Sequence, residues 1–244
     1  MKLRITKRAY ILPFIALTSL FSLKVSSIGK KNTGMVVAAP AVAVSAAAML
    51  YEQLSLDSLG LSKEAYEFAL QGQEQLAKEG KLRNENILSI VDFSLPSTKK
   101  RLFVIDISSG QLLFNSLVSH GRNSGKEMAT SFSNSPESYK TSLGFYVTGG
   151  TYRGKHGYSL RLEGEESGIN DNAMERAIVM HAASYVNEVL GRKQGYIGRS
   201  LGCPALPVKL HKKIISTIQN GSCLFMYSPD TSYLTRSKLL QHTA

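Results

Sequence analysis

Cysteine is scarce in this sequence, which has only Cys203 and Cys223 among its 244 residues. Two cysteines exclude a disulfide-rich mini-scaffold and a four-cysteine zinc ribbon, but they leave open one disulfide bond or one reactive thiol. The sequence also has no glycine-rich loop of the phosphate-binding type, so it carries neither a Walker motif nor a dinucleotide-binding fingerprint. It has no internal repeat, and a hydrophobic content of 43% excludes collagen, coiled coil and wholesale disorder.

Acidic residues are absent before Glu52, whereas the first 31 residues contain seven lysines and arginines. The formal net charge is +11, and without those residues it would be 11 − 7 = +4. A basic chain suggests a nucleic-acid or membrane-surface partner. We expect no nucleic-acid partner, because most of the surplus lies at the N-terminus and the sequence has no basic helix face, zinc knuckle or aromatic-interleaved basic strand. The rest of the chain suits an anionic polymer.

The N-terminus has the pattern of an export signal. A basic stretch at residues 2–8 precedes an apolar run at residues 9–23, which is too short for a comfortable membrane span. We therefore expect residues 1–34 to be a signal peptide, with an uncleaved membrane anchor as the alternative. The protein is then exported, to the periplasm or cell envelope.

The remaining chain divides into three parts by composition. Residues 35–85 are an Ala-rich linker followed by a helical segment, with a helix beginning after Ser62 and ending near Gly80. Residues 86–229 carry many strand patterns and one late helix, which predicts a mostly β domain of the α+β class. Residues 230–244 are expected to be a polar tail.

Within residues 86–229, runs of β-branched and aromatic residues separated by Gly, Ser and Asn predict strands. These runs are residues 87–93, 101–107, 112–119, 143–148, 158–162, 177–181 and 223–227. A helix is expected between Pro207 and Asn220, with Ile214 and Ile218 on its apolar face and His211 on its exposed face.

The stretch 198–207, Gly-Arg-Ser-Leu-Gly-Cys-Pro-Ala-Leu-Pro, is the most informative. Gly202 permits a close backbone approach beside the thiol of Cys203, and the prolines at 204 and 207 stiffen the exit from the turn. Such a turn presents a side chain, and its backbone N–H groups can point at a developing oxyanion, as acyl transfer requires. Cys223 lies in an apolar strand pattern and is interpreted as a small buried core residue.

A cysteine nucleophile needs a base, and His181 is the candidate because it ends a strongly apolar strand. The alternative interpretation is a packed histidine and a structural thiol. His120 and His156 also lie near predicted strand ends, so three histidines could form a zinc site. Their separations of 36 and 25 residues match no helical ligand motif. We therefore expect no metal and no cofactor, and we interpret His120 and His156 as lining a groove or lying on its surface.

These residues together resemble a known family. The runs around His181 and Cys203, His-Ala-Ala and Ser-Leu-Gly-Cys, resemble the L,D-transpeptidase catalytic domain, whose usual pattern is His-Gly followed by Ser-His-Gly-Cys. Residues 93–106, 120–125 and 198–207 are similar to a murein L,D-transpeptidase branch of that superfamily. The resemblance covers roughly residues 50–230. It implies a β-sandwich or barrel-like catalytic domain with the thiol at the base of a groove.

The resemblance also implies a reaction on peptidoglycan stem peptides. Cys203 would attack the carbonyl of the third residue of a tetrapeptide donor, expel D-alanine and hold the peptide as a thioester. The side-chain amine of a second stem's diamino acid would then accept the acyl group in a 3→3 cross-link. His181 would act as general base and acid, and the amides of Gly202 and Cys203 would serve the oxyanion. The alternatives are water as acceptor, in an L,D-carboxypeptidase or amidase, and a non-catalytic peptidoglycan-binding module.

Three positions depart from the family pattern. Leu201 replaces a histidine, and Ala182 replaces a glycine. Ala205 stands where an arginine usually follows two residues after the cysteine. The first change leaves His181 as the base, and the last removes a cation that could bind a substrate carboxylate.

Arg199 or Arg122 could supply the missing cation, because each lies beside a glycine in a predicted loop and a guanidinium is suited to a carboxylate. The alternative for both is a solvated surface arginine. The substrate-binding residues expected from the sequence are Arg199, Ser200, Arg122, His120 and His156.

Overall fold

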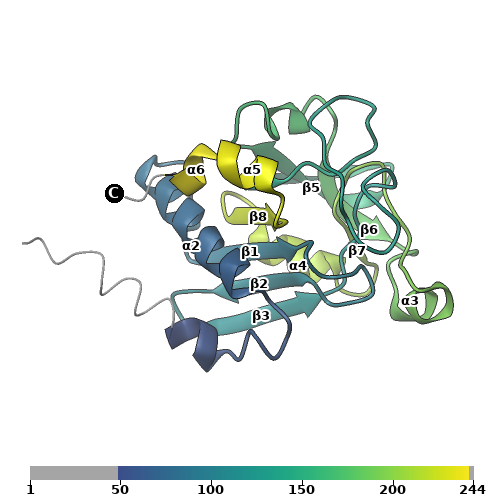
Figure 1. Cartoon of the computed structure of the whole chain (residues 1–244), viewed down its shortest axis with the longest axis horizontal. Coiled ribbons are helices and arrows are strands. Elements are labelled where there is room, and N and C mark those ends of the chain that lie inside the picture. The colour runs from purple at the N-terminus through teal and green to yellow at the C-terminus, as the bar shows by residue number, and fades with distance from the viewer. Residues whose placement is uncertain (1–48, 242–244) are drawn as a thin grey trace, which may run out of the picture. The chain divides into compact units, whose positions relative to one another are not determined.

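One eight-stranded sheet organises residues 49–241, which are the residues that the computed structural model describes (Figure 1). Its strands are β1 (Ile87–Asp92), β2 (Leu102–Asp106), β3 (Gln111–Ser116), β4 (Gly144–Gly154), β5 (Gly157–Gly164), β6 (Val179–Ala183), β7 (Ala205–Pro207) and β8 (Cys223–Tyr227). Their order in the sheet is β3-β2-β1-β8-β4-β5-β6-β7. The β1–β8 and β6–β7 pairs are parallel, and the other pairs are antiparallel. The predicted mostly β fold is confirmed.

The two ends of the sheet are joined beyond its edge strands. The chain that leaves β3 continues to Ser119, whose N–H donates to the carbonyl of Ala205 in β7 at 2.9 Å. The N–H of Ser200 donates to the carbonyl of His120 at 2.9 Å, and Gly121 and Ser200 form a parallel bridge. The sheet is therefore barrel-like, and its closure lies next to the cysteine turn.

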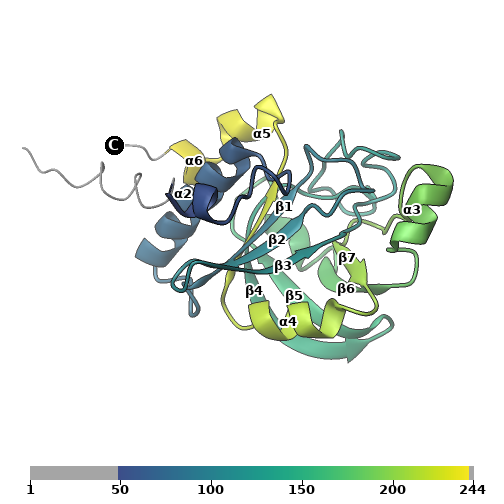
Figure 2. The same cartoon turned by 90° about the horizontal axis from the view of Figure 1, so that it is seen from below.

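Helix α2 (Lys63–Lys78) covers the strands that form the middle of the sheet, and it lies on a different side from α4 (His211–Ile218) (Figure 2). Its predicted beginning is confirmed, because the Ser62 side chain accepts a hydrogen bond from the N–H of Ala65 at 3.1 Å. Gly72 lets the helix approach the sheet closely, since a Cβ at this position would lie 2.1 Å from the ring of Phe145.

Several elements were not expected from the sequence. Helix α3 (Glu188–Gln194) and the short strand β7 have no clear sequence pattern. The predicted strand at 143–148 continues to Gly154. The β4–β5 pairing shifts register between Thr148 and Thr151, where Gly149 and Gly150 lie, and the strand continues beyond this irregularity. His211 is also buried rather than exposed, with Nδ1 2.8 Å from the carbonyl of Val208.

Two short helices replace the predicted polar tail over most of its length. Helices α5 (Thr231–Arg236) and α6 (Lys238–Gln241) follow β8, and the Asp230 side chain caps α5 by accepting from the N–H of Tyr233 at 2.9 Å. Tyr233 and Leu239 are buried, and α6 lies against α2 (Figure 1). Ser237 is buried as well, and its hydroxyl donates to the carboxylate of Glu166, so both apolar and polar contacts attach this segment.

The predicted export segment at 1–34 and the Ala-rich part of the linker lie outside the described residues. Among residues 49–241, no helix is both long enough and apolar enough to cross a membrane.

Candidate functional site

Cys203 lies in a turn that the side chain of Ser200 holds closed. Ser200 Oγ donates to the carbonyl of Cys203 at 2.6 Å and accepts from the N–H of Gly202 at 3.0 Å. Gly202 has a φ of +130°, and a Cβ there would lie 3.0 Å from both Ile178 Cδ1 and the carbonyl oxygen of Lys140. The turn therefore requires glycine beside the cysteine, for conformation and for space.

The thiol of Cys203 is bonded to the backbone at the start of β6. The N–H of Val179 donates to Sγ at 3.5 Å, and the thiol donates to the carbonyl of Ala177 at 3.7 Å. Burial raises the pKa of the Cys203 thiol, while the Val179 amide and the positive charge of Arg176 lower it; burial dominates. Because the thiol pKa is raised, a reaction at Cys203 needs a base to remove its proton.

The predicted base, His181, lies on β6, the strand whose first residue, Val179, is bonded to the thiol. It follows Val179 by two residues, which is about 7 Å along a strand, and pairs in register with Ala205 of β7. Nδ1 lies 2.9 Å from the carbonyl of Ala182, so this nitrogen carries the proton and Nε2 holds the free lone pair. Burial lowers the pKa of His181, which keeps the imidazole neutral at neutral pH.

No hydrogen bond joins the imidazole of His181 to the thiol among residues 49–241. The thiol is engaged with Ala177, so its proton must leave that carbonyl before His181 can accept it. In active sites without substrate, catalytic side chains often have separate hydrogen-bond partners, and the hydrogen bond between them tightens only when substrate binds.

His156 stacks on His181 from the turn between β4 and β5. The two ring centroids are 4.2 Å apart, with an interplanar angle of 21°. His156 is exposed, whereas His181 is 3% exposed. The ring of His156 thus lies against the imidazole of His181, and the predicted role of His156 in substrate binding stays a prediction. Leu201, which replaces the second motif histidine, is 58% exposed and is bonded to neither ring.

Arg176 is the positively charged residue that acts on the thiol of Cys203, and we did not expect it from the sequence. It immediately precedes Ala177, and its positive charge lowers the pKa of Cys203. Tyr185 was missed as well: burial and the negative charge of the Cys203 thiolate raise the pKa of Tyr185. No sequence signal marks Arg176, because its hydrogen-bond partners lie more than 30 residues earlier in the chain.

Arg199 and Arg122 brace the loop next to the cysteine turn. Arg199 Nη1 donates to the carbonyls of Arg122 and Gly125, both at 3.0 Å. The guanidinium of Arg122 is exposed and lies 4.2 Å from the ring centroid of Tyr139. Within the described residues neither arginine is hydrogen-bonded to Cys203, so their predicted role would be with substrate rather than with the thiol.

His120 is fully buried, behind the turn rather than on a groove wall. Its Nδ1 lies 2.7 Å from Nη2 of Arg101, and its Nε2 lies 3.3 Å from the carbonyl of Gly125. A guanidinium can only donate and a carbonyl can only accept, so the proton is on Nε2. Both ring nitrogens are occupied, which leaves neither of them for a metal or a substrate while this loop is closed. Substrate binding by His120 and by the equally buried Ser200 stays a prediction.

Replacing His120 by asparagine is expected to make the free energy of unfolding fall less steeply as the pH is lowered. Burial and the charge of Arg101 lower the pKa of His120 to about 3. Between pH 6.5 and 3 the unfolded chain therefore binds a proton that the folded chain excludes, so stability is lost as the pH falls. The scale is on the order of 4 kcal/mol. Urea unfolding of both proteins from pH 7 to 4 measures this, and parallel curves would contradict it.

The sequence also left open a disulfide bond and a zinc site. Both cysteines are free thiols, and Cys223 is buried in β8 at the middle of the sheet. No group of three or more His, Cys, Asp or Glu side chains in this part of the chain is placed to hold a metal ion.

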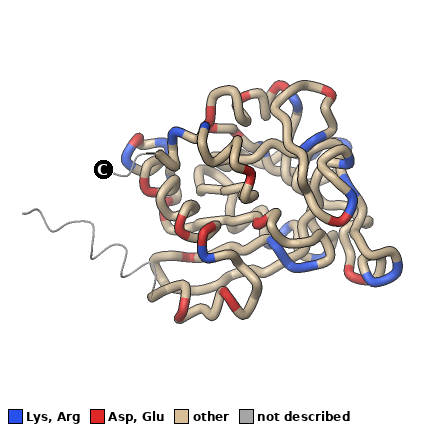
Figure 3. The backbone as a smooth tube through the Cα atoms, in the orientation of Figure 1, with Lys and Arg blue, Asp and Glu red and all other residues tan. Residues whose placement is uncertain are grey.

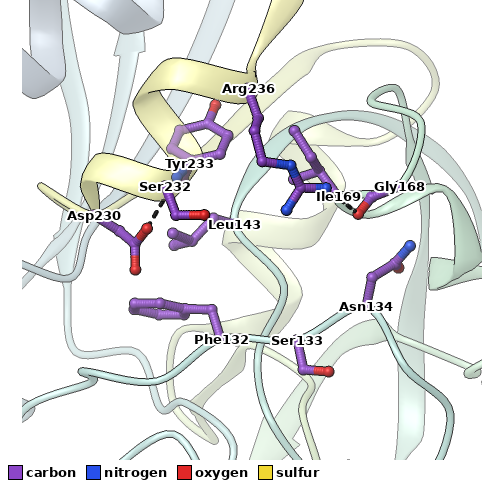
Figure 4. Close-up of a pocket in the computed structure, with 10 residues that line it drawn as sticks. All are labelled: Phe132, Ser133, Asn134, Leu143, Gly168, Ile169, Asp230, Ser232, Tyr233 and Arg236. Atoms are coloured by element: carbon purple, nitrogen blue, oxygen red, sulfur yellow. Dashed lines mark hydrogen bonds between the residues drawn. The ribbon is translucent and has the colours of Figure 1, made fainter.

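A cavity of about 140 Å³ lies apart from the thiol (Figure 4). It is lined by the 132–134 segment, the 168–169 turn and α5, and Arg236 Nη2 donates to the carbonyl of Gly168 at 2.9 Å across its rim. Small-molecule pockets are usually about 300–1,000 Å³. The cavity is smaller than this, and we assign no ligand to it.

Comparison with known proteins adds a family. The chain matches the L,D-transpeptidase catalytic domain over residues 57–227, and no curated protein matches it. L,D-transpeptidase 3 from Mycobacterium tuberculosis is 12% identical, with a TM-score of 0.38 and coverage of 59% of this chain and 61% of that one. The helical cell shape determining protein Pgp2 from Campylobacter jejuni is 16% identical, with a TM-score of 0.37 and coverage of 67% and 57%. This chain thus spans less than two thirds of both structures.

Proposed function

Because this chain belongs to the L,D-transpeptidase catalytic domain family, we propose that it is a cysteine-dependent transpeptidase of peptidoglycan stem peptides in the cell envelope, with residues 1–34 as its export segment. The observation that carries the proposal is the hydrogen bond from the N–H of Val179 to Sγ of Cys203, at the start of the strand that carries the neutral imidazole of His181 two residues further on. A thiol and a neutral imidazole that can accept its proton are the pair that thioester chemistry needs.

The charge around the thiol supports an anionic substrate. Residues 189–229, which contain the cysteine turn, β7 and α4, have no Asp or Glu and have six Lys or Arg. Figure 3 shows lysines and arginines gathered on α3 and the neighbouring loops, whereas acidic residues are frequent around α2. Stem peptides carry free carboxylates, which such a surface attracts.

In the first half-reaction, His181 Nε2 accepts the thiol proton as Sγ of Cys203 bonds to the carbonyl carbon of the third stem residue. The resulting oxyanion accepts a hydrogen bond from the Cys203 amide, which donates to no other described residue. The Gly202 amide, also expected in this role, is bonded to Ser200 Oγ and contributes only when that bond opens. The bond to D-alanine then breaks, His181 returns the proton to the leaving amine, and a thioester remains.

In the second half-reaction, the side-chain amine of a second stem attacks the thioester carbonyl. His181 accepts a proton from this amine, the C–S bond breaks, and Sγ leaves as the thiol form of Cys203 once it is reprotonated. The product is a 3→3 cross-link. With water in place of the amine, the same steps release a tripeptide, as in an L,D-carboxypeptidase.

Cys203→Ala is expected to abolish acylation, because it removes the attacking sulfur. The full chain is incubated with disaccharide-tetrapeptide and measured by intact-protein mass spectrometry. The wild type is expected to gain the mass of the donor minus D-alanine, and Cys203→Ala to gain none. Cys223→Ala is the matched control, since Cys223 is buried in β8, and it is expected to acylate like the wild type.

Adding excess acceptor stem to the acylated protein identifies the second step. A dimeric muropeptide supports transpeptidation, and a released tripeptide without dimer assigns the carboxypeptidase instead. If folded wild-type protein with a free Cys203 thiol gives neither adduct nor product, the proposal fails. Wall binding that is unchanged in Cys203→Ala would then favour a non-catalytic peptidoglycan-binding module.

A further inference from the structure

We propose that Arg176 is the positioning residue of the Cys203 thiol: it fixes the cysteine turn against the 133–142 segment and holds a positive charge beside the thiolate. The proposal deepens the proposed function, since it concerns the same thiol. The predicted role of Arg199 or Arg122 in binding a substrate carboxylate is separate from this proposal and stays a prediction.

The guanidinium of Arg176 is clamped by one segment. Nη1 donates to the carbonyl of Ser133 at 2.9 Å and to Oγ of Ser142, and Nη2 donates to Oγ of Ser138 at 3.2 Å and to the carbonyl of Lys140 at 2.6 Å. All four partners are neutral oxygens, and Arg176 forms none of the ion pairs among residues 49–241. Its charge is therefore not cancelled by a carboxylate in contact with it.

The same clamp touches the cysteine turn. Arg176 Nη2 lies 3.3 Å from the position where a Cβ of Gly202 would stand, and the carbonyl oxygen of Lys140 lies 3.0 Å from it. Thr141, in the clamped segment, donates from Oγ1 to the carbonyl of Gly202 at 3.2 Å. The space left by the missing side chain of Gly202 is thus partly occupied by the guanidinium.

Arg176 also adjoins the carbonyl that accepts from the thiol. That carbonyl belongs to Ala177, a non-glycine residue with a φ of +51°. A left-handed alanine is strained and persists only where its neighbours hold it. Arg176, fixed by four hydrogen bonds, is the neighbour before it, and Ile178, whose N–H donates to the carbonyl of Ala173 at 2.8 Å, is the neighbour after it.

An enclosed cation favours the charged form of a nearby thiol. Burial lowers the pKa of Arg176 and raises that of Cys203, and in each case the charge of the other group opposes the effect of burial. A guanidinium suits this place better than an ammonium, because its planar fork supplies the four hydrogen bonds without losing its proton.

The test measures the thiol itself, so it needs no substrate. In a Cys223→Ala background, the rate of Cys203 alkylation by iodoacetamide is followed from pH 6 to 10 by intact mass spectrometry. Arg176→Met is expected to raise the thiol pKa by about one unit or more, a tenfold loss of thiolate at fixed pH. Arg199→Met removes an arginine that is bonded to the carbonyls of Arg122 and Gly125 and whose charge does not act on the thiol, so it is expected to leave the thiol pKa unchanged.

An Arg176→Met protein that is folded by circular dichroism and keeps the wild-type thiol pKa would overturn the proposal. If Arg176→Met does not fold, Arg176→Lys decides: it keeps the charge but not the fork, so we expect a thiol pKa near that of the wild type and a lower Tm. A thiol pKa in Arg176→Lys raised by a full unit would overturn it as well. Because alkylation does not depend on stem peptides, the proposed function can fail while this result stands.

Discussion

Replacing His181 by alanine is expected to slow acylation of Cys203 by about two to four orders of magnitude while leaving the fold intact. The reason is that burial keeps the thiol of Cys203 protonated at neutral pH, so attack requires a base. His181 is neutral there, and its Nε2 is free because Nδ1 is bonded to the carbonyl of Ala182. The measurement is the rate of adduct formation with disaccharide-tetrapeptide, read by intact-protein mass spectrometry.

The pH profile separates a base from a merely structural histidine. A general base acts above its pKa, and the pKa of His181 is lowered from 6.5 by burial and by His156. The wild type is therefore expected to keep its acylation rate below pH 6.5 and to lose it only as the pH falls through the lowered value. In His181→Ala this limb should vanish, and the rate should instead rise with the thiolate fraction toward high pH.

His211→Asn is the matched control for His181, because His211 is also a buried histidine but belongs to α4, with its Nδ1 bonded to the carbonyl of Val208. We expect its acylation rate to stay within about twofold of the wild type, since the proton transfer does not pass through it. A folded His181→Ala protein with a wild-type rate would remove His181 from the mechanism.

Replacing Arg101 by methionine is expected to lower the free energy of unfolding by about 3–5 kcal/mol. Arg101 is completely buried, and it donates from Nε and Nη2 to the carbonyl of Val118 at 3.2 and 3.0 Å. It also donates to the carbonyl of Leu95 at 3.0 Å and to His120 at 2.7 Å. Methionine would fill part of the volume but would leave these acceptors without a donor.

Two opposing effects decide whether Arg101→Met raises or lowers the free energy of unfolding. Removing a buried charge relieves desolvation, the effect that lowers the pKa of Arg101 to about 9. Replacing a buried ion by an apolar residue is favourable when its partners are replaced too. Here they remain as buried carbonyls and an imidazole, so the loss of hydrogen bonds is the larger effect.

Urea denaturation of Arg101→Met beside Arg161→Met measures the difference. Arg161 is exposed and lies 4.6 Å from the ring centroid of Tyr152, an interaction of about 0.5–1 kcal/mol. An Arg101→Met protein as stable as Arg161→Met would show that the buried guanidinium contributes nothing net. The loss of the Arg101 hydrogen bonds is also expected to affect the cysteine turn, because the carbonyl of His120 accepts a hydrogen bond from the N–H of Ser200 in that turn.

The strands were predictable because their signal is local. Alternating or continuous runs of β-branched and aromatic residues mark β1, β2 and β8 to within about one or two residues, and the Ser62 cap marks the start of α2. Strand β7 was not predictable, since a three-residue strand next to Pro204 exists only because β6 and the Ser119 segment pair with it. Helices α5 and α6 likewise depend on burial of Tyr233 and Leu239.

The sequence by itself determined the family resemblance and the mostly β class, and it predicts Cys203 with His181 as the chemically important pair. Each of these depends on residue types within a short stretch of chain. Only the tertiary structure decided what surrounds them: the guanidinium of Arg176 against the cysteine turn, His156 stacked on His181, and His120 buried against Arg101. These contacts join residues that are 19 to 43 positions apart in the chain. Because burial and charge act through space, no local sequence pattern encodes them.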